Sequence, residues 1–206
     1  MLSKIHHKIT TLAPYDFFYW LTIINVLLIG AAIIFYNGRF LFWDYPFSSA
    51  GATYTVAGAK NLLSQRIYRS DMLISGLIMF SFAYNSVKNR SETQKLLKTL
   101  LSSVAGIGFV TAAFSPDDTA HNLHVFSSAL IVSMIWLLAT NYLVEVRKYL
   151  KGKTYYWFQL ILQIPLFVYA LTYFLQLDPT SYSIQKFALL GIGVVLLCST
   201  SIYKTN

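Results

Sequence analysis

Two aspartates, two histidines and a proline are concentrated in one short stretch, FSPDDTAHNLH, between Phe114 and His124. The chain contains only four histidines and eight acidic residues among its 206, and long apolar runs flank the stretch on both sides. Serine is a favoured N-cap, proline is favoured at the first helical position, and acidic residues in the first turn complement the helix dipole. Ser115 and Pro116 therefore predict a helix that begins at Pro116.

A helix with this start would gather four polar side chains within an arc of about 60°, counted at 100° per residue. They are Asp117, His121, His124 and Ser128. Asp118 lies off this stripe. Ionisable groups inside a membrane are costly unless they find partners. We therefore expect the stripe to point into the helix bundle, with Asp71 or a group of the first loop nearby.

Three interpretations of the stripe remain open. The side chains could only position the helix, with the histidines bound to neighbouring helices. They could bind a metal ion or shuttle protons, because zinc accepts nitrogen and oxygen ligands. Asp117, His121 and His124 would then be metal ligands, and Asp71 could supply a fourth. They could also form another polar ligand site, such as a pocket for a lipid headgroup. Zinc is the one cofactor that these residue types suggest, and the other interpretations need none.

Two further pairs of residues are candidates for the same site. Arg69 and Asp71 lie at the start of the second predicted span, where snorkelling and a surface ion pair are their ordinary roles. Ser48 and Ser49 belong to the sequence SSAG in the long first loop. The candidate ligand-binding residues are therefore Asp117, His121, His124, Ser128, Asp71, Arg69, Ser48 and Ser49.

The composition indicates that membrane helices position these residues. The chain is 56% hydrophobic and 12% charged, with a mean hydropathy of +0.54, whereas soluble domains carry about 25% charged residues. A lone cysteine, Cys198, excludes an intrachain disulfide and a thiolate zinc cage. We predict an all-α fold, a polytopic membrane protein with one integral membrane domain over residues 1–206. Spanning helices need about 20 apolar residues, and the six segments that qualify are Phe17–Tyr36, Tyr68–Val87, Leu97–Phe114, Leu123–Val144, Tyr155–Phe174 and Phe187–Tyr203.

The distribution of charge predicts the orientation of this six-helix bundle. Six spans place eleven Lys and Arg and three acidic residues on one side, against five and five on the other, so the whole net charge of +8 lies on one side. Positive residues mark the cytoplasmic side, which makes both termini cytoplasmic. Anionic lipid headgroups account for the positive charge, and no nucleic-acid partner is needed. We expect an integral protein of the cytoplasmic membrane of a prokaryote.

The connection between the first two spans, about Asn37–Ile67, is then a long extracytoplasmic loop. It is rich in aromatic and small residues and poor in charge. We expect it to pack on the bundle and roof the polar pocket, with a short helix from about Thr53.

Small and amide residues predict contacts between the spans. Gly106 and Gly108, and likewise Gly191 and Gly193, are typical of close helix packing. Gln159, Gln163 and Pro165 predict a hydrogen-bonding polar edge and a kink in the fifth span.

Several membrane chemistries do not fit the sequence. A haem bundle needs histidines on facing helices, whereas both histidines of the predicted spans and their edges lie on one helix. A serine protease motif, the paired aspartates of CDP-alcohol phosphotransferases, the motif of lipid phosphatases and a retinal-binding lysine in the last span do not occur in matching positions.

Four short motifs resemble those of a known group. They are SSAG at Ser48–Gly51, GIG at Gly106–Gly108, SPDD at Ser115–Asp118 and the histidine of NLH, His124. Their order resembles the DRAM family (damage-regulated autophagy modulators, grouped with the Frag and yeast Sfk proteins) and its prokaryotic relatives of unknown function. The family's acidic residue soon after the Ser/Gly motif has no counterpart in Ala52–Ala59. The resemblance implies six helices and a membrane-organising or lipid-related role, with no established reaction.

Three functional hypotheses follow. The first is a non-enzymatic membrane protein that binds membrane lipids or a membrane-protein partner through the extracytoplasmic polar pocket. The second is a metal-dependent intramembrane lipid hydrolase that uses the Asp/His cluster. The third is an accessory subunit of a larger membrane complex.

Overall fold

Six long helices make up most of the chain in a computed structural model that describes residues 12–88, 94–178 and 180–205. They are α2 (Pro14–Ile34), α3 (Leu62–Lys88), α4 (Lys95–Phe114), α5 (His121–Glu145), α6 (Gly152–Phe174) and α7 (Thr180–Thr205). Two short 3-10 helices, η1 (Phe47–Gly51) and η2 (Val146–Tyr149), complete the regular structure of the described ranges. Each of the six predicted spans coincides with one long helix, so the all-α prediction is confirmed.

Five of the six helices are long and apolar enough to cross a membrane, which indicates an integral membrane protein. The exception is α3, whose sequence carries more polar residues. Many of these polar side chains turn inward: Ser64, Asp71, Ser75, Asn85 and Ser86 are fully buried. The outward side of α3 carries apolar residues such as Leu77, which is 64% exposed.

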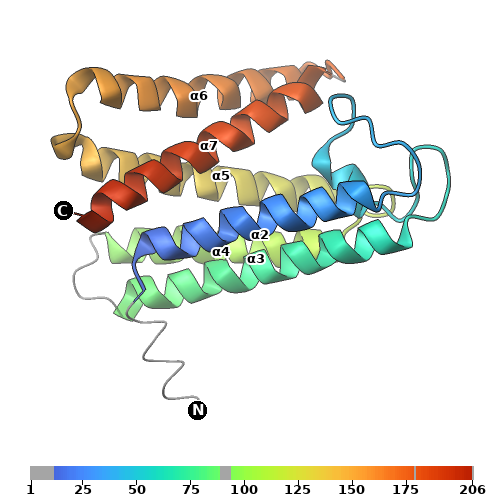
Figure 1. Cartoon of the computed structure of the whole chain (residues 1–206), viewed down its shortest axis with the longest axis horizontal. Coiled ribbons are helices and arrows are strands. Elements are labelled where there is room, and N and C mark those ends of the chain that lie inside the picture. Colours follow the sequence, from blue (N-terminus) through green and yellow to red (C-terminus); the bar gives the residue numbers. More distant parts are fainter. Residues whose placement is uncertain (1–11, 89–93, 179, 206) are drawn as a thin grey trace, which may run out of the picture.

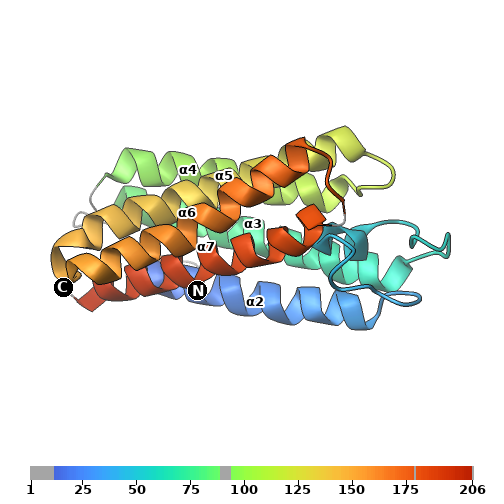
Figure 2. The ribbon, with the colours of Figure 1, turned by 90° about the horizontal axis from the view of Figure 1, so that it is seen from above.

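The helices form an elongated bundle (Figure 1). Helix α3 packs against α2 and α4, α5 packs against α4 and α7, and α7 also contacts α2. Helix α6 lies at the outer edge, where it packs mainly on α7 (Figures 1 and 2). The start of α2 and the end of α7 lie at the same end of the bundle, where Lys204 Nζ is 2.9 Å from Asp16 Oδ1.

Aromatic rings fill the core of the bundle. The ring of Phe18 on α2 lies edge-on to Phe82 on α3 and to Tyr142 on α5, with centroid distances of 4.8 and 6.1 Å. Such edge-to-face pairs add to the stabilisation from burial. Three helices are thereby joined around one buried phenylalanine.

Glycines allow three of the close helix contacts. A Cβ atom on Gly106 would lie 2.8 Å from the ring of Phe80, and one on Gly191 would lie 2.5 Å from the carbonyl oxygen of Ile161. A Cβ atom on Gly108 would lie 3.1 Å from the Ser127 carbonyl oxygen. The predicted packing role is therefore confirmed for these three glycines. Gly193 differs, since nothing lies within 4 Å of the Cβ position there.

The polar edge of α6 is also confirmed. Trp136 Nε1 on α5 donates to Gln163 Oε1 at 2.9 Å, and Gln163 Nε2 donates to Gln159 Oε1 at 3.1 Å. The amides thus satisfy one another and the indole within the apolar bundle. Helix α6 continues through Pro165.

The predicted start of the fourth span is wrong. Helix α5 begins at His121, and Pro116–Ala120 form a turn in which Ala120 N–H donates to the carbonyl of Pro116 at 2.8 Å. Ser115 does not cap α5. It is the residue that ends α4, and its hydroxyl donates to the carbonyl of Thr111 at 2.8 Å. Ser115 and Pro116 thus mark the end of α4 and the turn after it, and not the start of α5.

The first loop is shorter than expected and contains no helix after Thr53. Thr55 N–H donates to the carbonyl of Ala59 at 2.8 Å, Tyr54 and Lys60 form an isolated β-bridge, and α3 starts only at Leu62. Gly58, with φ of +82°, supplies the left-handed residue that this tight turn needs. The predicted short helix from about Thr53 is therefore wrong.

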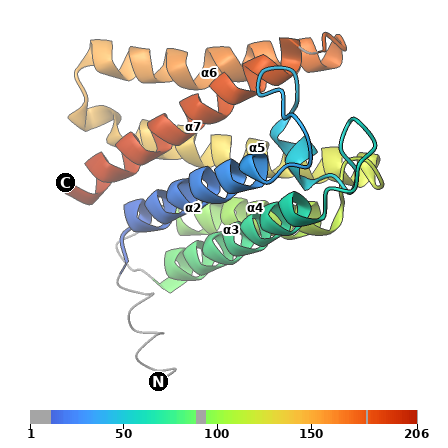
Figure 3. The same cartoon turned by 45° about the vertical axis from the view of Figure 1, so that its right-hand side comes forward.

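The first loop packs on the bundle, as predicted. Lys186 Nζ on α7 donates to the carbonyl of Tyr45 at 2.9 Å and lies over the rings of Phe42 and Phe47. Trp43 stacks on Phe187 with a centroid distance of 6.0 Å. Figure 3 shows the loop beside the start of α7 and near the α4–α5 turn.

Candidate functional site

Asp118 ties the first loop to the α4–α5 turn. Its two carboxylate oxygens accept the backbone N–H groups of Thr53 and Tyr54, each at 2.9 Å. Hydrogen bonds to an ionised acceptor are stronger than those between neutral groups. One side chain therefore holds together two segments that are 64 residues apart in the sequence.

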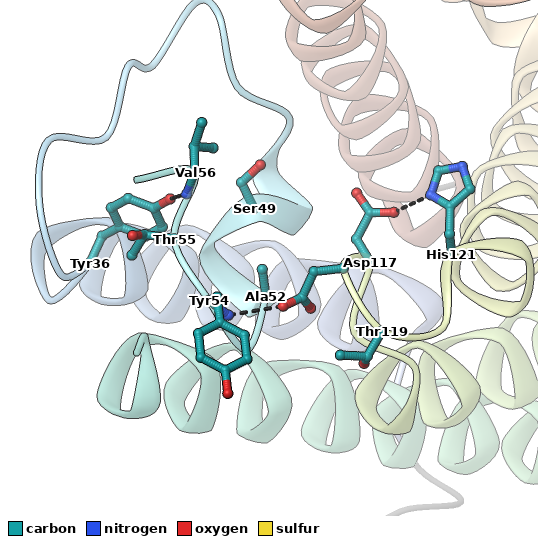
Figure 4. Close-up of a pocket in the computed structure, with 10 residues that line it drawn as sticks. Tyr36, Ser49, Ala52, Tyr54, Thr55, Val56, Asp117, Thr119 and His121 are labelled. Carbon is teal, nitrogen blue, oxygen red and sulfur yellow. Dashed lines mark hydrogen bonds and ion pairs between the residues drawn. The ribbon is translucent and has the colours of Figure 1, made fainter. Parts of the chain in front are cut away.

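A cavity of about 490 Å³ lies between these two segments (Figure 4). Hydroxyl groups, two carboxylates and one imidazole make up its polar lining, and neither lysine nor arginine takes part. The lining residues are Tyr36, Ser49, Ala52, Tyr54, Thr55, Val56, Asp117, Asp118, Thr119 and His121.

The predicted stripe is divided between the cavity and the helix bundle. His121 Nδ1 lies 2.7 Å from Asp117 Oδ1 at the cavity edge (Figure 4), and the His121 side chain is 68% exposed. His124 is only 4% exposed, and its Nδ1 lies 2.7 Å from the carbonyl oxygen of Ser115. Because a carbonyl oxygen can only accept, Nδ1 carries the donated proton. Nε2 of His124 then faces the hydroxyl of Ser128 at 3.4 Å. The expected convergence of both histidines is therefore wrong, while the expected pairing of Asp117 with His121 is present.

His124 instead holds the α4–α5 turn in place from inside the bundle. It joins the first turn of α5 to Ser115, the residue that follows α4, nine positions earlier in the sequence. A buried imidazole with a short hydrogen bond to a backbone carbonyl positions the chain around it. This contact corresponds to the structural interpretation of the stripe for His124.

Arg69 and Asp71 do not form the expected surface ion pair. Arg69 Nε donates to the carbonyl of Ala113 at 2.9 Å, and its guanidinium lies over the ring of Phe114. A cation at the last carbonyls of a helix is favourable, so Arg69 stabilises the end of α4. Asp71 is completely buried within the bundle and does not line the cavity.

The two serines of the first loop lie on the short helix η1. Ser49 lines the cavity and Ser48 is half-buried beside it in the sequence. The small residues that follow have a packing role: a Cβ atom on Gly51 would lie 2.3 Å from the ring of Tyr68. The motif SSAG thus lets the loop backbone rest directly on α3.

A second cavity of about 360 Å³ adjoins the first, and Tyr36 lines both. Its lining combines Lys60 with the exposed apolar side chains of Ile34, Phe35, Leu62 and Leu63. The Tyr36 hydroxyl accepts the backbone N–H of Val56 at 3.1 Å, which fixes the ring between the cavities (Figure 4).

The zinc hypothesis gains no support from this arrangement. Among residues 12–88, 94–178 and 180–205, no three His, Cys, Asp or Glu side chains are grouped closely enough to hold a metal ion. Of the expected ligands, only Asp117 and His121 are paired.

Sequence reasoning missed three residues of the site. Asp118 was set aside because it lies off a helical stripe that the turn does not form. Tyr36 and Lys60 carry no local motif, and only the tertiary contact between α2 and the first loop places them at the cavities. The adjacent pair Asp117–Asp118 followed by His121 was the one available signal, because it concentrated acceptors in a turn.

The comparisons with known proteins leave this site without a named counterpart. No family model, curated protein or solved structure matches the chain. The function must therefore be argued from the residues of the site itself.

Proposed function

We propose that this chain is a six-span protein of a prokaryotic cytoplasmic membrane that binds an amine-bearing phospholipid headgroup beneath its first loop. Both termini are cytoplasmic, and the first loop and the cavity face the extracytoplasmic side. The lipid-related role implied by the resemblance to the DRAM family is part of this proposal.

The polarity of α3 supports a sixth span. A helix at the surface of a water-soluble protein turns polar residues outward, whereas α3 buries Asp71 and Ser75 and exposes Ile74 and Leu77. In a bilayer, polar groups are instead satisfied inside the bundle. The low mean hydropathy of α3 thus reflects its interior face.

The distribution of charge supports the orientation. Lys88, Lys95, Arg147 and Lys148 lie in or beside the connections at the end of the bundle opposite the cavity. Lys4, Lys8, Arg90 and Glu92, which also entered the predicted charge balance, lie outside the described residues. Positive residues concentrate on the cytoplasmic side.

The observation that carries the lipid proposal is the adjacency of an acidic cavity and a basic, apolar one. Asp117 and Asp118 can accept from a primary amine, while Lys60 lies in the neighbouring cavity and can pair with a phosphate. The exposed rings and methyl groups around Lys60 then offer a path for acyl chains. A free anion is a poor ligand for the first cavity, because the carboxylates of Asp117 and Asp118 would repel it.

The metal-dependent hydrolase has no supporting observation, because His124 and Asp71 lie apart from the Asp117–His121 pair. An accessory-subunit role has none of its own either. It is tested in passing, because a larger complex would appear as a larger native mass when the protein is purified from its own membrane.

Lipid binding is tested by native mass spectrometry of the purified, delipidated protein. The probes are phosphatidylethanolamine and phosphatidylglycerol with identical acyl chains. We expect the ethanolamine lipid to be retained preferentially, and Asp117→Asn to remove the preference because the amine loses a carboxylate partner. Asp44→Asn is the matched control, since Asp44 is an exposed acid of the first loop that does not line the cavity.

Equal retention of both lipids by the wild type would contradict the proposal. The same holds if Asp117→Asn retains the ethanolamine lipid as well as Asp44→Asn does.

A further inference from the structure

A buried carboxyl group in α3, that of Asp71, makes no hydrogen bond within the part of the chain that the structure describes. Asp71 is 0% exposed, and neither of its oxygens has a partner among the described residues. It lies nine residues into a helix of 27 residues, so about 14 Å from the start of that helix. Unpartnered carboxylates are rare in protein interiors, and those inside membrane helices mark functional sites.

The surroundings of Asp71 are polar but uncharged. Ser75, one turn further along α3, is the neighbouring hydroxyl, and its oxygen accepts the amide N–H of Asn25 on α2 at 2.8 Å. This row of Asp71, Ser75 and Asn25 crosses from α3 to α2. A carboxylic acid O–H at Asp71 could donate to the remaining lone pair of Ser75.

The described charged residues near α3 do not reach Asp71. Arg69 is held at the Ala113 carbonyl. Asp16 of α2 and Lys98 of α4 lie at the far end of the bundle, where they pair with Lys204 and with Glu145. Helix η1 carries no ionisable side chain.

An ionised carboxylate is far more costly than a neutral acid in such a place, because one neighbouring hydroxyl, that of Ser75, cannot replace its water shell. We propose that Asp71 is an intramembrane proton-binding site, a neutral carboxylic acid that exchanges its proton with the cavity through Tyr68. This inference rests on the proposed sixth span, α3. It does not rest on the lipid, because it concerns a different ligand at a different depth.

Tyr68 connects the two levels of the molecule. It lies one turn before Asp71 on the same helix and is buried, with Asp71 and Asp117 as neighbouring carboxyl groups. Its ring lies directly under the backbone of Gly51, so the loop covers this route. A phenol can both donate and accept a proton in a hydrogen bond, which suits it to relay a proton between the two aspartates.

Infrared spectroscopy of the full-length protein tests the site directly. In a maltoside detergent, which has no ester carbonyl, we expect a protonated-acid band at neutral pH. Carbon-13 labelling of the aspartates should shift this band without any mutation. Asp71→Asn, which keeps the side-chain shape, should remove it, and Asp44→Asn should retain it. A wild type without the band, or a band that persists in Asp71→Asn, overturns the proposal. Loss of the band at constant pH on adding sodium would also overturn it, because the ligand would then be a sodium ion.

The route is tested by the rate at which the band shifts after transfer to heavy water. Tyr68→Phe keeps the ring on which Gly51 rests and removes only the hydroxyl, so we expect slower exchange at Asp71. Tyr169→Phe, which alters a tyrosine of α6 that does not line the cavity, should exchange at the wild-type rate. Unchanged exchange in Tyr68→Phe overturns the relay through Tyr68.

Discussion

Lys98 shows how a single buried charge can join the helices at the end opposite the cavity. It is 0% exposed, and its Nζ lies 2.8 Å from Glu145 Oε2. The same amino group lies over the rings of Tyr142 and Tyr203, at 4.1 and 4.8 Å from their centres. Cation–π contacts of a desolvated amine are worth up to about 2 kcal/mol. In the sequence, Lys98 is merely one of several cations beside a span.

The first prediction concerns this ion pair. Glu145→Gln should lower the free energy of unfolding by about 3 kcal/mol, because the buried ammonium loses this counter-charge. The double variant Lys98→Met/Glu145→Gln should recover most of that loss, since no charge is left in the apolar site. Denaturant titration in detergent measures both. A double variant as unstable as Glu145→Gln would show that the pair stabilises by other means.

At the scale of elements, α6 depends on one close contact with α7. Helix α6 is the least buried of the five helices that are apolar enough to cross a membrane. Where it meets α7, the Cα of Gly191 faces the carbonyl of Ile161. Small residues allow such approach between membrane helices.

The second prediction compares the two glycines of α7. Gly191→Ala should cost about 1–3 kcal/mol, because a methyl group 2.5 Å from the Ile161 carbonyl forces the helices apart. Gly193→Ala should be neutral or stabilise by up to about 1 kcal/mol, since alanine is the better helix former and the position is open. Thermal unfolding in one detergent compares them. Equal effects of both substitutions would contradict this account of α6 docking.

At the scale of the whole molecule, antiparallel helices place the connections alternately at two ends. The end of α7 contacts the start of α2 through Lys204 and Asp16. The start of α4 and the end of α5, joined by Lys98 and Glu145, lie at the same end of the bundle (Figure 1). The first loop and the α4–α5 turn share the other end, where Asp118 joins them. The orientation in a membrane then depends only on which of these two ends faces the cytoplasm.

The third prediction tests that choice by cysteine labelling of intact cells in a Cys198→Ser background. Thr180→Cys, exposed at the start of α7, should react with an impermeant thiol reagent from outside. Thr154→Cys, exposed at the start of α6, should react only after the membrane is opened. The neighbouring Ser181 is not a suitable labelling position, because it is fully buried. The reverse pattern of labelling would invert the orientation and place the cavity in the cytoplasm.

The sequence alone determined the six helices and a few of the contacts between them. Apolar runs of spanning length can satisfy their backbone only as helices in lipid, so each run predicted a helix correctly. The glycines at 106, 108 and 191 and the amides of α6 were also interpreted correctly. In these cases the requirement is local to one helix face.

Only the tertiary structure decided the site. Whether Ser115 ends α4 or begins α5 depends on the burial of its carbonyl beside His124. Whether Asp118 is a helix cap or a loop clamp depends on where Thr53 lies, far away in sequence. Asp71 shows the same limit, because its isolation follows from what α2, α4 and η1 do not place beside it. Hydrogen bonds and charge pairs between distant segments are set by how the helices pack, and no periodicity along the chain encodes them.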